Sequence, residues 1–267
     1  MRIKYRHGGK EKMIQKVLAS IGIGNAKVDT KLQSSKFTAG DVVSGVTEIV
    51  GGNVDQQIDT IYLTLFTTYL KEANDKKYYD TAVIARFTIS EPFTIAAGEK
   101  RAIPFSFNLP FTTPITRGKT KVWIQTELDI KMAVDPTDKV YIEVLPAPIA
   151  AKVMNSIRAL GFRMKSADCE RAPYKLKVPH SFIQEFEYSV TNVQYRRYLE
   201  ELELTFLNQS ANHVELLIQI DRRARGLGGL FAEALDMDET FVRLTFTKDN
   251  IHGIHSTLQQ TIEKYMK

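Results

Sequence analysis

The chain contains 267 residues, of which 43% are hydrophobic and 25% charged, with 15 glycines, 9 prolines and a formal net charge of +5. These fractions are those of ordinary globular proteins and exclude collagen-like, disulfide-dense and wholly disordered classes. Because Cys169 is the only cysteine, no intrachain disulfide can form, and a reducing, cytoplasmic compartment is expected. No signal-peptide core and no run approaching roughly 20 apolar residues is found.

Most of the positive charge lies in the first twelve residues, where five basic residues oppose Glu11 alone: Arg2, Lys4, Arg6, Lys10 and Lys12. The rest of the chain is nearly neutral, which argues against nucleic acid as a partner, because such proteins usually carry a basic stripe and a reading motif. Residues 1–12 are expected to be an extension or tail. A short amphipathic helix ending at Gly22 is predicted next from apolar residues at helical spacing: Met13, Val17, Leu18 and Ile21.

From about Ala26 to Leu145 the apolar period changes to two, which is typical of strands with one face in water. The clearest run covers residues 122–132, and similar runs cover 57–69, 83–90, 103–109 and 140–145. Turn signals such as Gly51-Gly52-Asn53 and Asp135-Pro136 separate these runs. The pattern predicts an antiparallel sandwich of seven strands, because no connection contains the helix that a parallel α/β sheet needs.

A boundary is expected at Pro146-Ala147-Pro148, where two prolines stiffen the chain and Pro148 suits the first position of a helix. Helical spacing then continues as far as Gly161. The two-residue period returns in 182–190, 202–206, 214–220 and 242–246, before a closing helix over 251–262.

We therefore predict an all-β chain with a few short helices, built from two antiparallel β-sandwiches joined by a hinge. The expected units are the tail over 1–12, an N-terminal sandwich with its leading helix over 13–147, and a C-terminal sandwich over 148–267. The C-terminal unit includes the linker helix and the closing helix.

Several short segments resemble the bacterial sporulation-control protein family, usually called SpoOM: residues 23–30 (IGNAKVDT), 51–54 (GGNV), 61–63 (IYL) and 121–126 (KVWIQT). The likeness runs from about Met13, the usual start in this family, to Met266, and it is spread over strands and turns. It implies an arrestin-like architecture of two β-sandwiches across a hinge. It also implies a regulator or scaffold that acts on signalling during the decision to sporulate.

Two glycine-containing segments bear a partial likeness to nucleotide-binding loops. Gly118-Lys119-Thr120 ends like a phosphate-binding loop, but the glycine required five residues earlier is Thr113. Gly226-Leu227-Gly228-Gly229 has Phe231 in place of the last glycine of a dinucleotide loop and no βαβ context. A turn and a loop, respectively, are the better interpretations.

Other reactive residue types also lack a complete site. His252 and His255 have no third metal ligand nearby in sequence, and the acidic neighbours of Cys169 disfavour its thiolate. Aromatic residues such as Trp123 fall on predicted strands, where they pack well. We expect no enzyme activity, no cofactor and no metal.

The segment after residue 221 is the candidate contact region, because it combines basic and apolar residues: Arg222, Arg223, Arg225, Leu230 and Phe231. This combination suits an acidic partner or an anionic membrane, and a solvated loop before a short packed helix is the simpler alternative. The expected function is a scaffold or adaptor that binds other proteins, with self-association to a homodimer left open. The alternative is a peripheral membrane-binding protein that uses residues 222–235.

Overall fold

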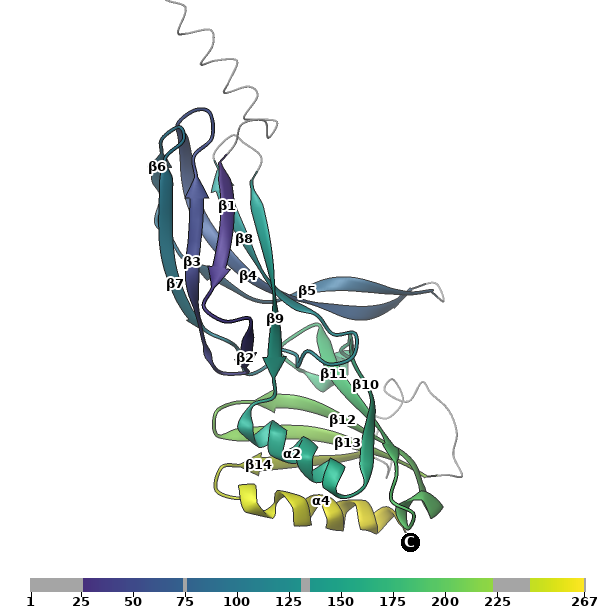
Figure 1. Cartoon of the computed structure of the whole chain (residues 1–267). Helices are drawn as coiled ribbons and strands as arrows, with labels where there is room; N and C mark the ends of the chain where they lie inside the picture. The colour runs from purple at the N-terminus through teal and green to yellow at the C-terminus, as the bar shows by residue number, and fades with distance from the viewer. Residues whose placement is uncertain (1–25, 74–75, 131–134, 223–240, 267) are drawn as a thin grey trace, which may run out of the picture.

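The structure is a computed structural model that describes residues 26–73, 76–130, 135–222 and 241–266. Figure 1 shows an elongated molecule in which strands β1–β9 form one part and strands β10–β14, with two helices, form the other. We call residues 26–147 the N-terminal half and residues 148–266 the C-terminal half. The predicted all-β class with a few short helices is confirmed.

The N-terminal half is a sandwich of two sheets. Its strands are β1 Lys27–Leu32, β2 Lys36–Thr38, β3 Val42–Val50, β4 Gln56–Ala73, β5 Lys76–Thr88, β6 Phe93–Ile95, β7 Lys100–Asn108, β8 Val122–Ile130 and β9 Thr137–Leu145. Strands β1, β3 and β7 form a three-stranded antiparallel sheet that packs on β4, β8 and β9. Seven strands were predicted here, and the two three-residue strands β2 and β6 bring the described number to nine. Such short strands carry too few residues for an alternating pattern.

The sandwich core follows directly from the alternation in the sequence. Val43 of β3 and Phe105 of β7 meet Leu65 of β4 and Ile124 of β8 in one buried cluster. A second cluster closes the far end of the sandwich around Ile49 and Leu128. Because successive strand residues point to opposite faces, the residues between these core positions lie on the outer face of the larger sheet.

Strand β4 connects the two halves. It is 18 residues long, pairs with β5, β6 and β8, and meets β10 in parallel at the single pair Leu70 and Glu170. The sheet therefore runs through both halves, in the order β14-β13-β12-β11-β10-β4-β8-β9-β2. Apart from the parallel pairs β4–β10 and β2–β9, the ladders of this sheet are antiparallel.

The C-terminal half is an antiparallel meander covered by helices. Its elements are α2 Pro148–Ala159, β10 Phe162–Arg171, η1 Tyr174–Leu176, β11 Phe182–Val190, η2 Tyr195–Arg197, β12 Leu199–Gln209, β13 His213–Arg222, β14 Phe241–Thr247, η4 Ile251–Gly253, α4 Ile254–Glu263 and η5 Lys264–Met266. Helices α2 and α4 lie side by side on one face of this sheet (Figure 1). In the described residues these helices, and not a second sheet, form the layer opposite β10–β14.

Helix α2 begins and ends where the sequence predicts. Pro148 occupies its first turn, and the chain leaves the helix at Gly161, whose φ of 91° favours glycine. A Cβ atom at Gly161 would lie 2.6 Å from the Cβ atom of Asn192, so space as well as conformation requires glycine there. Ile149, Val153 and Ile157 face the sheet together with Leu258 of α4.

The substitution Ile157→Ala tests this helical layer. Ile157 is fully buried between α2 and the sheet, so the cavity left by alanine should lower the free energy of unfolding by about 2–5 kcal/mol. The measurement is urea-induced unfolding followed by circular dichroism. Lys152→Ala on the exposed side of α2 is the control and should stay within about 0.5 kcal/mol of the wild type. Equal effects of the two substitutions would contradict the packing of α2 on this sheet.

Candidate functional site

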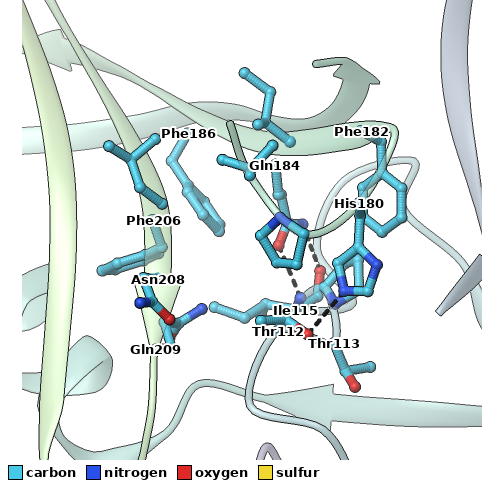
Figure 2. Close-up of a pocket in the computed structure, with 15 residues that line it drawn as sticks. Thr112, Thr113, Ile115, His180, Phe182, Gln184, Phe186, Phe206, Asn208 and Gln209 are labelled. Carbon is cyan, nitrogen blue, oxygen red and sulfur yellow. Dashed lines mark hydrogen bonds between the residues drawn. The ribbon is translucent and has the colours of Figure 1, made fainter. Parts of the chain in front are cut away.

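The segment between β7 and β8 joins the two halves through a buried side chain. Gln184 of β11 accepts a hydrogen bond from the backbone N–H of Ile115 at 2.8 Å and donates one to the carbonyl of Ile115 at 2.7 Å (Figure 2). Its amide nitrogen also lies 3.3 Å from the hydroxyl of Thr120, which in turn donates to the carbonyl of Ala167 in β10. We call this set of contacts the Gln184 seam.

Residues on either side of Ile115 make further hydrogen bonds. Thr116 exchanges backbone and side-chain hydrogen bonds with Val144 of β9, and Thr112 contacts the ring of His180 at 2.8 Å (Figure 2). The cavity beside these residues has a volume of about 40 Å³. This is room for only a few water molecules and too little for an organic ligand, so we interpret the Gln184 seam as a structural joint.

The Gly118-Lys119-Thr120 triplet is a turn, as predicted. Gly118 has a φ of 60°, and a Cβ atom there would approach the carbonyl oxygen of Ala167 to 2.9 Å. Thr120 is buried in the Gln184 seam. The triplet therefore places the N-terminal half against β10, and Thr120 is not free to hold a phosphate or a metal.

The structure describes the surroundings of Cys169 and of the metal-ligating residue types. Burial raises the pKa of the Cys169 thiol to about 12, and Asp168 and Glu170 add smaller upward shifts. The sequence indicates an unfavourable thiolate from these two charges alone, but burial of the thiol is the larger cause of its raised pKa. Among the described residues, no three histidine, cysteine or acidic side chains are placed to share a metal ion.

An aromatic row crosses the outer face of the N-terminal sheet. Phe66 of β4 stacks on Trp123 of β8 with ring centroids 5.5 Å apart, and Trp123 packs against Tyr141 of β9 at 5.8 Å. The Lys139 ammonium group lies 4.6 Å from the centroid of the Trp123 ring. Strand register continues the row from Phe66 to Val83 of β5. Trp123 is buried by these neighbours, yet its indole N–H has no hydrogen-bond partner among the described residues.

Strand β5 ends this row as an edge strand. It pairs with β4 on one side, and no described strand pairs with its other side. Figure 1 shows that the distal part of the β4–β5 hairpin projects from the body of the molecule. Tyr79 is 49% exposed and Val83 is 54% exposed, and both point to the outer face. The backbone N–H of Thr81 bonds the Asp80 carboxylate at 2.8 Å, so this donor is turned away from β4.

By strand register, these residues lie on one face of the sheet. We call the set Phe66, Tyr79, Val83, Trp123 and Tyr141 the β5 edge surface. An edge strand with exposed apolar side chains is the kind of surface to which a further strand can pair, and soluble proteins usually protect it. Its exposed part has no proline and is protected mainly by charges, such as the Lys71–Asp80 pair at 2.8 Å.

Acidic residues cluster on the C-terminal sheet, on the face opposite the helices. Lys165 of β10 pairs with Glu187 of β11 and lies 3.3 Å from Glu201 of β12. Burial, with smaller contributions from neighbouring carboxylates, raises the pKa of Glu185 to about 9 and that of Glu203 to about 7. Glu185 also has a buried carboxylate oxygen without a partner among the described residues. At neutral pH, Glu185 therefore retains a proton in the folded state.

The contact region expected from the sequence cannot be placed. Arg222 is the last residue of β13, and its side chain is not described. Arg223, Arg225, Leu230 and Phe231 lie outside the described residues. The predicted helix over 13–21 and the tail over 1–12 also lie outside them. No helix in the described part of the chain has the length and hydrophobicity needed to cross a membrane.

The fold defines a mostly β protein with a few short helices, in which a β-sandwich and a helix-covered antiparallel sheet are joined. The chain belongs to the SpoOM protein family, whose profile matches residues 14–224. Sporulation-control protein spo0M of Bacillus subtilis (strain 168) is 39% identical over 255 residues, which are 94% of this chain and 98% of that protein. The crystal structure of Spo0M from Bacillus subtilis superimposes with a TM-score of 0.83 at 38% identity, covering 91% of this chain and all of that one. The family resemblance predicted from the sequence is thereby confirmed.

The substitution Gln184→Leu tests the seam. Leucine keeps much of the side-chain volume but leaves the backbone N–H and C=O of Ile115 buried without partners, which should lower stability by about 1–3 kcal/mol. Urea-induced unfolding measures the change. Gln260→Leu on the exposed face of α4 is the matched control and should change stability by less than about 0.5 kcal/mol. A Gln184→Leu protein as stable as the control would show that the seam does not contribute to the free energy of unfolding.

The carboxyl group of Glu185 should make stability fall as pH rises. Its pKa is raised to about 9 in the folded state, against about 4.3 in an unfolded chain. Between these values the folded state holds more protons than the unfolded state, so stability decreases from about pH 4.5 to about pH 9. Glu185→Gln should flatten this dependence and should be more stable than the wild type at pH 8.

Urea midpoints measured at intervals from pH 5 to pH 9 check this expectation. Glu200→Gln, an exposed position on the neighbouring strand β12, is the control and should follow the wild-type curve. If Glu185→Gln follows that curve as well, protonation of Glu185 does not contribute to the pH dependence of stability.

Proposed function

We propose that this chain is a non-enzymatic scaffold in the control of sporulation, which binds extended segments of other proteins at the β5 edge surface. The name of the Bacillus subtilis relative supports the regulatory role, because that protein is a sporulation-control protein of nearly the same length. The free edge of β5, lined by exposed Tyr79 and Val83, is the single observation that supports the mode of binding. The proposal places this activity in the cytoplasm.

Strand addition suits this edge for a physical reason. A partner segment that lies along β5 would take the place of the Asp80 carboxylate at the outward N–H of Thr81, and main-chain hydrogen bonds of this kind supply affinity without requiring a particular sequence. Alternate side chains of the segment would lie beside the outward-facing side chains of β5, which include Tyr79 and Val83. These neighbours favour apolar or aromatic residues at every second position of the segment.

Photo-crosslinking from Tyr79 tests the location. The photoreactive amino acid p-benzoylphenylalanine replaces Tyr79 in one protein and Tyr174 in a second, and cells are irradiated before and during sporulation or growth arrest. Tyr174 is 97% exposed but lies on η1 in the C-terminal half, so it controls for exposure alone. Protein adducts from position 79 that are absent from position 174 are expected. Equal adducts at both positions, or none at position 79, would contradict the proposal.

The substitution Val83→Lys tests the mode of binding. A lysine on an edge strand opposes pairing with a further strand, so the yield of the Tyr79 adducts should fall roughly tenfold. Val42→Lys is the matched control, because Val42 is 59% exposed on β3 of the other sheet. The melting temperature of both variants should remain within a few degrees of the wild type, about the effect of surface changes. Loss of adducts in both variants would mean that the β5 edge is not the determinant.

A further inference from the structure

A groove lies beside α2, where the two halves meet. Its volume is about 610 Å³, within the range of roughly 300–1,000 Å³ that is usual for small-molecule sites. Residues from α2, from β10 and β11, and from the segments around Arg117 and Pro146 line it. The groove is therefore built from both halves. Ile115 lines both this groove and the small cavity beside the Gln184 seam.

The groove carries a net positive charge. Arg117 comes from the segment between β7 and β8, Arg158 from α2 and Arg163 from β10. No aspartate or glutamate lines the groove in the described part of the chain. None of the three guanidinium groups forms an ion pair with another described residue, and Arg158 bonds only the side-chain oxygen of Asn155, at 3.2 Å. Three cations that line one groove without a counter-charge among its lining residues favour an anion.

Apart from the arginines, the groove is lined mainly by apolar side chains, with Asn155, Tyr188 and Thr191 as the polar ones. Met154 and Met164 are half-buried side chains that line it, and Tyr188 is 2% exposed. The Tyr188 hydroxyl has no hydrogen-bond partner among the described residues. Most buried polar atoms in folded proteins have a partner, and an unpartnered one costs stability, so a polar atom of a ligand is the natural partner here.

We propose that this groove binds a small organic anion with an apolar body. The negative group lies among Arg117, Arg158 and Arg163, the apolar body contacts Met154 and Met164, and a polar atom bonds the Tyr188 hydroxyl. Because Arg117 belongs to one half and Arg158 to the other, the bound anion would also strengthen the contact between the halves. This site is separate from the β5 edge surface, and the inference does not rest on the proposed scaffold function.

Titration of the full chain with 8-anilinonaphthalene-1-sulfonate tests the site, because this dye is an organic anion with an apolar body. N-phenyl-1-naphthylamine has a similar body without the sulfonate and is the neutral comparison probe. Calorimetry is expected to give one sulfonate dye per chain. The triple variant Arg117→Gln, Arg158→Gln, Arg163→Gln should bind the sulfonate roughly tenfold more weakly and the neutral probe unchanged.

The matched control is the triple variant Arg171→Gln, Arg196→Gln, Arg197→Gln, which removes three exposed arginines that do not line the groove. It should bind the sulfonate as the wild type does. Tyr188→Phe provides a second test that does not depend on charge. Its melting temperature without dye should equal or exceed that of the wild type, while its affinity for the sulfonate dye should fall by about threefold or more.

Either of two results would overturn the proposal. One is equal sulfonate affinity in the wild type and the groove triple variant. The other is binding of several dye molecules per chain with no difference between the groove triple variant and the control triple variant. A Tyr188→Phe protein that loses stability but keeps full dye affinity would assign its hydroxyl to the fold and remove it from the site.

Discussion

The arrangement of this protein depends on the hydrogen bonds between the side chain of Gln184 and the backbone of Ile115. The halves are also joined by the parallel pair Leu70 and Glu170 and by Phe182 of β11, which packs in the N-terminal core cluster. Gln184 fixes the position of the connecting segment on the C-terminal sheet, because its carboxamide satisfies a buried N–H and a buried C=O at once. The segment that carries Ile115 is also bonded to β9 at Thr116 and to β10 at Thr120, so both halves are held by one short stretch of chain.

This joint gives the two surfaces of the protein a fixed relation. The β5 edge surface lies wholly on the N-terminal half, whereas the groove with Arg117 and Arg158 exists only when the halves are in contact. A scaffold of this form can hold a partner segment at one place while a ligand at another acts on the contact between the halves. Coupling of this kind requires a difference in ligand affinity between two arrangements, and the mixed origin of the groove residues provides a structural basis for it.

The sequence predicts the strands well and the joints poorly. The alternation in residues 182–190 coincides with β11, and Pro148 and Gly161 bound α2, because these patterns depend on local burial and backbone geometry. The helical layer over the C-terminal sheet was missed, although its apolar spacing was visible, since spacing does not tell which face of a sheet a helix covers. From the sequence, Gln184 is predicted only to lie inside a strand, because its partner Ile115 lies 69 residues away. Arg117 and Arg158 are also distant in sequence, so no local pattern predicts that they line one groove. The free edge of β5 follows from strand order, which local patterns do not contain either.

Amide hydrogen exchange at Ile115 tests the central claim most directly, because this N–H is the donor that Gln184 accepts. If the seam holds the halves together, the Ile115 amide exchanges within roughly tenfold of the rate at Ile124, a buried residue of the central strand β8. Exchange as fast as at Lys119, on the exposed turn nearby, would show that the seam opens independently of the core and would contradict the account.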